Sequence, residues 1–170
     1  MRIRKIKKIR EKKGFTLIEV ITVLFVISLG MVGVLSLIMQ NIKSQSLNKN
    51  TLIAYQLAQE GVELIRQVRD SNWINARYWR TNLSHIHSLY YMDYLDSVPN
   101  DAHNRYDGNL VQDSNGFYHN DPSMSSTGIF SRLIRIDNSG NGILVTSNIY
   151  WTDHGRDYVY SLEAKLYDWK

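Results

Sequence analysis

The sequence predicts an α+β protein in which a long N-terminal helix packs on a small antiparallel β-sheet. Three observations support this prediction. Residues 15–39 form an apolar run with a single charge, long enough to cross a bilayer as a helix. Between residues 54 and 68, apolar side chains recur every three or four positions, which is the period of an amphipathic helix. After residue 128, three stretches of β-branched, aromatic and alternating apolar residues are separated by turn residues, which is typical of strands joined by hairpins.

Basic side chains are concentrated at the N-terminus. Residues 1–14 hold eight of the 20 Lys and Arg residues and one of the 16 acidic residues, so the rest of the chain has a net charge of about −3. This acidic body argues against a nucleic-acid partner, because nucleic-acid binding needs clustered cations on the binding surface. The chain has no cysteine, which excludes disulfides, thiolate metal sites and cysteine nucleophiles.

The apolar run differs from a cleaved secretory signal peptide. It is longer than the apolar region of such a peptide, and no small-residue cleavage site follows it. The basic leader, residues 1–14, precedes the run, so the positive-inside rule places the N-terminus in the cytoplasm and residues 40–170 outside. A plain membrane anchor is the alternative, but it does not explain Glu19. A charged side chain at the centre of a membrane helix costs about 2.5–3.5 kcal/mol, and less near an end.

Glu19 has a physical explanation if the chain is cleaved between Gly14 and Phe15. The new α-amino group then lies at the start of the helix, and the amine of a neighbouring copy can meet the Glu19 carboxylate. The low dielectric constant strengthens this ion pair, which forms at only one axial stagger of the two copies. Glycine at position 14 leaves room for a protease to approach the backbone.

Residues 12–20, K-K-G-F-T-L-I-E-V, closely resemble the class III signal of type IV prepilins and type II secretion pseudopilins. The resemblance implies that a prepilin peptidase cleaves after Gly14 and N-methylates Phe15, and that Glu19 aids assembly into a filament. It implies a bacterial or archaeal cytoplasmic membrane as the first location, followed by a pilus or pseudopilus. The implied partners are the peptidase, other pilin or pseudopilin subunits, the inner-membrane assembly platform and lipid. The implied fold is the pilin-like lollipop.

The membrane segment departs from the family pattern at one point. Many major pilins have a proline in its second half, where this chain has Ser36. Gly30 and Gly33 could supply a weak point instead, since glycine costs a helix about 1 kcal/mol relative to alanine. The same spacing could equally provide a groove for close helix packing. Both explanations remain open.

The helix is expected to continue over residues 40–72 as a soluble amphipathic half, weakest at residues 41–50, where the sequence is polar. Gly61 lies on its apolar stripe, and we expect a strand or a ring to cross close to the backbone there. Residues 55–66 and 69–73 are similar to the post-membrane region of minor pilins of the PilV or pseudopilin I type, which favours a minor subunit. The expected stripe consists of Ala54, Leu57, Ala58, Gly61, Leu64, Ile65 and Val68.

Residues 73–170 are expected to form a globular head. It is divided into a variable loop region at about 73–128 and antiparallel strands at about 129–168. Short helical turns are expected near residues 76–80 and 89–95, and the three strands at 129–136, 143–151 and 158–166. We expect the aromatic residues of the loop region to cover a small core, with an adhesive or sugar-stacking surface as the alternative. These residues are Trp73, Tyr78, Trp79, Tyr90, Tyr91, Tyr94 and Tyr106.

Candidate ligand sites in the head are weak. Residues 137–142, D-N-S-G-N-G, partly resemble a calcium loop, but its twelfth position is Asn148 instead of a bidentate glutamate, so we predict a hairpin turn. His85 and His87 have no third ligand at metal-binding spacing. The sequence contains no phosphate-binding loop and no organised catalytic triad. We therefore predict neither an enzyme nor a cofactor.

The sequence thus predicts a structural subunit, a minor pilin or pseudopilin of a type IV pilus or a type II secretion-like pseudopilus. A single-pass membrane-anchored binding or adhesion domain is the first alternative, and it predicts that Glu19→Ala leaves display unchanged. A DNA-uptake minor pilin is the second alternative, and the acidic body argues against it.

Overall fold

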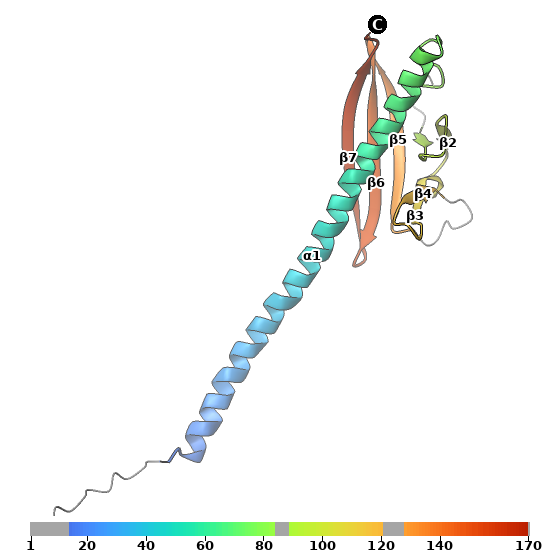
Figure 1. The fold of residues 1–170 in the computed structure, drawn as a ribbon. Coiled ribbons are helices and arrows are strands. Elements are labelled where there is room, and N and C mark those ends of the chain that lie inside the picture. The colour runs from blue at the N-terminus through green and yellow to red at the C-terminus, as the bar shows by residue number, and fades with distance from the viewer. Residues whose placement is uncertain (1–13, 84–88, 121–127, 170) are drawn as a thin grey trace, which may run out of the picture. The chain divides into compact units, whose positions relative to one another are not determined.

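The computed structural model describes residues 14–83, 89–120 and 128–169. Internal contacts divide the chain into two units, residues 1–45 and 46–170. One helix, α1 (Leu17–Ile74), contributes to both units, and all other elements belong to the second (Figure 1). The architecture is therefore α+β, as predicted. The remaining elements are β1 (Leu89–Tyr91), β2 (Asn100–Ala102), the 3-10 helix η1 (Arg105–Gly108), β3 (Asn109–Gln112), β4 (Tyr118–Asn120), β5 (Phe130–Ser139), β6 (Gly142–Asp153) and β7 (Arg156–Tyr167).

The first unit contains the apolar half of α1. Its large apolar side chains are exposed, and this stretch is long and apolar enough to cross a membrane, with a mean hydropathy of 2.6 in its best window. An exposed apolar surface of this extent requires lipid or other helices to cover it. Residues 41–50, where we expected the helix to be weakest, are helical throughout.

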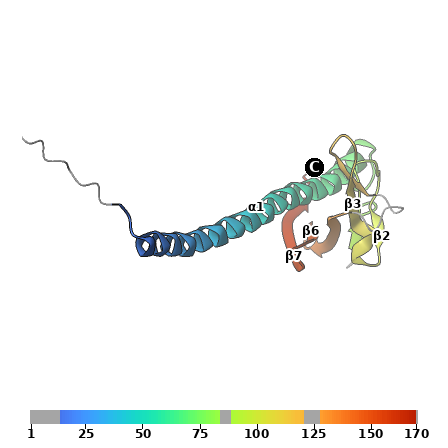
Figure 2. The same cartoon turned by 90° about the horizontal axis from the view of Figure 1, so that it is seen from below.

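The second unit contains the antiparallel meander that the sequence predicts. β6 pairs with β5 on one side and with β7 on the other, and both connections are two-residue turns. Gly140 in the first turn has φ +58°, while His154 and Gly155 in the second have φ +49° and +74°. Positive φ angles suit tight hairpin turns, because their twist matches that of the strands. Seen from below, the curved strands β6 and β7 lie on one side of the C-terminal half of α1 (Figure 2).

The core lies between the second half of α1 and the concave face of this sheet. All seven residues of the predicted helical stripe are buried. In β6, Ile143, Val145, Ile149 and Trp151 are buried and alternate with less buried residues, as predicted. The buried apolar side chains form two clusters, one around Ile65 and Ile134 and the other around Leu57 and Phe130.

A polar layer at Gly61 lies on α1 between the stretches that contribute to the two clusters. A Cβ atom at Gly61 would lie 2.5 Å from Ser147 Oγ and 3.0 Å from Arg132 Cδ, so strands β5 and β6 cross close to the helix here. The close crossing expected at this glycine is confirmed. Arg132 is 1% exposed and donates hydrogen bonds to the carbonyl oxygens of Leu57 (3.2 Å) and Met92 (2.8 Å). Its Nη1 also lies 3.1 Å from Glu60 Oε2. Arg132 thereby joins α1, β5 and the segment after β1.

The loop region is more regular than the sequence indicates. β1 and β3 both pair with β5, and together with their outer partners β2 and β4 they extend the meander to a seven-stranded sheet. The prediction of a helical turn near residues 89–95 is wrong for the first three of these residues, because Leu89–Tyr91 form a strand. Near residues 76–80 the chain does turn, with Thr81 N donating to Tyr78 O. The aromatic residues are divided: Trp79 and Tyr90 are buried, whereas Tyr78, Tyr94 and Tyr106 are at least half exposed.

Aspartate side chains hold the turns of residues 93–120. Asp93 accepts a hydrogen bond from Asn120 N (2.7 Å). Asp107 Oδ2 accepts from His103 N (2.7 Å) and Asn104 N (3.0 Å). Asp113 Oδ1 accepts from Asn115 N and Phe117 N, both at 2.8 Å. Backbone N–H donors favour the charged carboxylate, so they lower the pKa of Asp107 and Asp113.

These turns are expected to open in acid before the meander does. Because the folded pKa values of Asp107 and Asp113 lie below the unfolded value, their stabilising effect is present above that value and is lost as the pH falls through the folded pKa. Amide hydrogen exchange of residues 103–120 should therefore accelerate as the pH falls below about 4, after correction for intrinsic rates, while β6 stays protected. Asp107→Asn and Asp113→Asn should reduce this acid sensitivity, and Asp101→Asn on β2 is the control. Equal loss of protection in β6 would contradict the prediction.

Candidate processing and assembly site

The bond between Gly14 and Phe15 lies just before α1, where the described chain is exposed. Both residues precede the helix, and the Phe15 side chain is 82% exposed. A Cβ atom at Gly14 would have no neighbour within 4 Å. Glycine at this position is therefore not required by packing within the described residues, and its lack of a side chain is available to a protease.

Thr16 starts the helix and fixes the position of Glu19. Its carbonyl oxygen accepts hydrogen bonds from Glu19 N (3.1 Å) and Val20 N (3.2 Å), and its Oγ1 lies 3.3 Å from Glu19 N. This is the side-chain contact of an N-cap, and the T-x-x-E spacing is that of a capping box. The same spacing is visible in the sequence at residues 16–19. It identifies Thr16 as the residue that sets the first turn.

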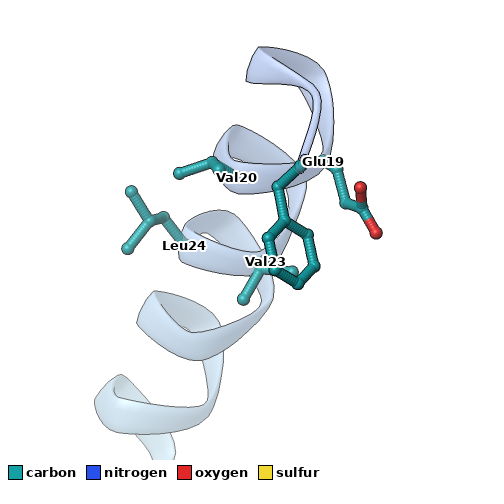
Figure 3. Close-up of a pocket in the computed structure, with 5 residues that line it drawn as sticks. Glu19, Val20, Val23 and Leu24 are labelled. Atoms are coloured by element: carbon teal, nitrogen blue, oxygen red, sulfur yellow. The ribbon is translucent and has the colours of Figure 1, made fainter. Parts of the chain in front are cut away.

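Glu19 carries its charge on the outside of that first turn. The helix macrodipole favours a negative charge at this end. Figure 3 shows its carboxylate pointing outward, on the other side of the helix from Val20 and Leu24. Among the described residues no side chain pairs with this carboxylate, so it is available to a group from another molecule. Glu19 also lines a shallow hollow of about 240 Å³ together with Phe15, Val20, Val23 and Leu24.

Residues 9–35 match a family model described as the prokaryotic N-terminal methylation motif. The chain carries the N-terminal signal of type IV prepilins and pseudopilins. This prepilin motif implies processing by a prepilin peptidase and assembly with other pilins. Together with the apolar half of α1, the prepilin motif supports a membrane-anchored pilin. No curated protein and no solved structure matches the chain.

The other candidate sites from the sequence are separate from the prepilin signal. Residues 137–142 form the end of the β5–β6 hairpin, so the predicted hairpin turn is confirmed. Asn148, at the twelfth position of the supposed calcium loop, lies within β6 and accepts a hydrogen bond from Ser161 Oγ (2.7 Å). No group of three or more potential metal ligands occurs within residues 14–83, 89–120 and 128–169. His85, His87 and residues 1–13 of the leader lie outside the described residues.

Proposed function

We propose that the protein is a minor pilin or pseudopilin that is cleaved after Gly14, N-methylated on Phe15 and assembled into a type IV pilus or a secretion pseudopilus. The observation that carries this proposal is the placement of Gly14, Phe15 and Glu19 at the exposed start of a membrane-length helix, directly after a basic leader. In the membrane, the N-terminus faces the cytoplasm and the second unit faces outward, as the charge distribution indicates.

Removal of the leader prepares the helix for extraction from the membrane. The leader carries eight basic side chains. Each charge costs several kcal/mol within the hydrocarbon core, so the uncleaved chain is held at the cytoplasmic surface. After cleavage, a single amine remains at the start of α1. The helix can then move into a filament, where its exposed apolar side chains pack against those of other subunits.

Glu19 sets the axial position of the incoming subunit. The Phe15 amine of one subunit and the Glu19 carboxylate of its neighbour neutralise each other in a region without water. Phe15 and Glu19 are four residues apart, about 6 Å along the helix axis. The ion pair therefore forms only when neighbouring helices are staggered, and an unpaired charge disfavours every other register.

In our proposal, the sequence of the second unit favours a minor subunit over a major one. The proposal rests here on the resemblance of residues 55–66 and 69–73 to the post-membrane region of minor pilins of the PilV or pseudopilin I type. In this role the helix provides lateral packing, while the head determines which surface the fibre presents.

Replacement of Gly14 tests the processing step. In cells with an active prepilin peptidase, Gly14→Leu should accumulate as the full-length chain, whereas the unaltered protein loses its leader. Gly30→Leu is the matched control, because a Cβ atom at either glycine meets no atom within 4 Å. Immunoblotting after pulse labelling separates the two forms by size. Normal loss of the leader from Gly14→Leu would contradict cleavage at this position.

A further inference from the structure

A cavity of about 480 Å³ lies within the second unit, and the prepilin signal gives it no role. Its volume is in the range of small-molecule sites, which is about 300–1,000 Å³. The wall combines three aromatic rings with two carboxylates and one amide. The lining residues are Glu60, Tyr94, Asp113, Asn115, Phe117 and Tyr118.

The backbone of Phe117 and the ring of Tyr118 are held by contacts within the second unit. Phe117 is 65% exposed at the end of the β3–β4 turn. Its N–H donates to Asp113 Oδ1 and its carbonyl oxygen accepts from Asp113 N (2.9 Å). The ring of Tyr118 packs edge-on against Phe130, with ring centroids 5.8 Å apart. A binding surface that is already ordered loses little conformational entropy when a ligand binds.

The charges that line the cavity are negative. Glu60 and Asp113 are carboxylates, and no Lys or Arg is among the lining residues. Glu60 is paired with Arg132, whose side chain is only 1% exposed and is not among the residues that line the cavity. Asp113 stays ionised at neutral pH, since the N–H groups of Phe117 and Asn115 lower its pKa.

We propose that this cavity binds an organic cation, that is, an alkylammonium or guanidinium group. The faces of aromatic rings attract cations, and rings surrounding a carboxylate-lined space provide both attraction and desolvation. An anionic ligand would be repelled by the Asp113 carboxylate, and the Glu60 carboxylate is already paired with Arg132. A neutral sugar could stack on the rings, but it would not use the charge of Glu60 and Asp113.

Two sources can supply this cation: a free small amine or headgroup, or a basic side chain of another protein. The shared chemistry is tested with full-length protein in an uncharged polyoxyethylene detergent, using saturation-transfer NMR at about pH 8, where the lysine and arginine probes are charged. The probes are tetramethylammonium, N-acetyl-lysine methylamide and N-acetyl-arginine methylamide. Their neutral comparisons are tert-butyl alcohol and methyl glucoside.

We expect at least one cation to bind about threefold or more tightly than either neutral probe. Phe117→Ala and Asp113→Asn should each weaken that binding by about threefold or more, and the amide introduced by Asp113→Asn still offers an oxygen to the turn. Tyr106→Ala and Asp101→Asn, an exposed ring and an exposed carboxylate outside the cavity, should leave it unchanged. Preference for tetramethylammonium indicates a free amine or headgroup, and preference for either amino-acid derivative indicates a partner's side chain.

Three results would overturn the proposal. These are equal or tighter binding of either neutral probe, no binding of any cation in the millimolar range, and cation binding that survives both Phe117→Ala and Asp113→Asn. None of them bears on cleavage after Gly14, so the cavity and the assembly function are tested separately.

Discussion

Replacement of Glu19 by alanine is expected to reduce incorporation of the protein into filaments by at least about tenfold. Removing one member of a desolvated ion pair costs about 3–5 kcal/mol, because the other charge is left uncompensated. In the proposed filament, the uncompensated charge would be the Phe15 amine of the neighbouring subunit. The measurement compares the amount of protein in sheared filaments with the amount that remains in the membrane.

A loss of incorporation in Glu19→Ala cannot result from failed membrane insertion. Glu19→Ala makes the membrane segment more apolar, so insertion becomes easier. Glu63→Ala is the control, because Glu63 is an exposed carboxylate of the same helix in the second unit and pairs with Arg66. Unchanged incorporation of Glu19→Ala would favour the single-pass anchor with a binding domain over the assembled subunit.

Replacement of Arg132 by alanine is expected to destabilise the second unit by on the order of 3 kcal/mol. The change removes the donor to the buried Met92 carbonyl oxygen and leaves a cavity beside Gly61 and Ser147. Met92 lies just after β1, so the variable region should loosen together with the helix contact. The urea midpoint of the full-length protein in detergent, followed by tryptophan fluorescence, measures the loss.

Two variants show whether burial and hydrogen bonding cause this effect. Arg135→Ala is the matched control, because Arg135 lies on the same strand with half of its side chain exposed and pairs with Asp137. It should change stability by less than about 1 kcal/mol. Arg132→Met retains the apolar stem and should fall between the two. A loss for Arg132→Ala no larger than that for Arg135→Ala would contradict the role of the polar layer.

The regular elements of this protein were largely predictable because their patterns are long. The helical stripe repeats over several turns, and β6 and β7 alternate over twelve residues each. The packing role of Gly61 could also be predicted, since a glycine on an apolar helical stripe indicates that another element lies close to the helix backbone. The N-terminal signal could be identified from the sequence because a carboxylate within an apolar run is costly to place in a membrane, and this cost indicates a function.

The short elements of the loop region were not predictable by the same means. β1, β2 and β4 have three residues each, too few to show a period of two. β1 is instead specified by its partners, because it pairs with both β2 and β5. Arg132 was missed for a related reason. An arginine in a strand suggests an exposed face, and only the tertiary structure shows Glu60 and the carbonyl oxygens of Leu57 and Met92 around it.

The cavity at Glu60 was missed because its residues are distant in the sequence. Glu60 lies on α1, Tyr94 follows β1, and the remaining residues belong to the β3–β4 hairpin. Asp113 could have been assigned to a turn from its D-S-N-G sequence, which is rich in turn formers. Asp113 lies close to Glu60 only because β3 pairs with β5, and this pairing is a feature of the tertiary structure.

The intact mass of the protein, extracted from membranes of cells with an active prepilin peptidase, tests the central claim most directly. We predict a mass equal to residues 15–170 with one added methyl group on the amine of Phe15. Fragmentation from the N-terminus should place that methyl group on the first residue. A mass equal to residues 1–170 would contradict the assignment of the protein as a processed pilin subunit.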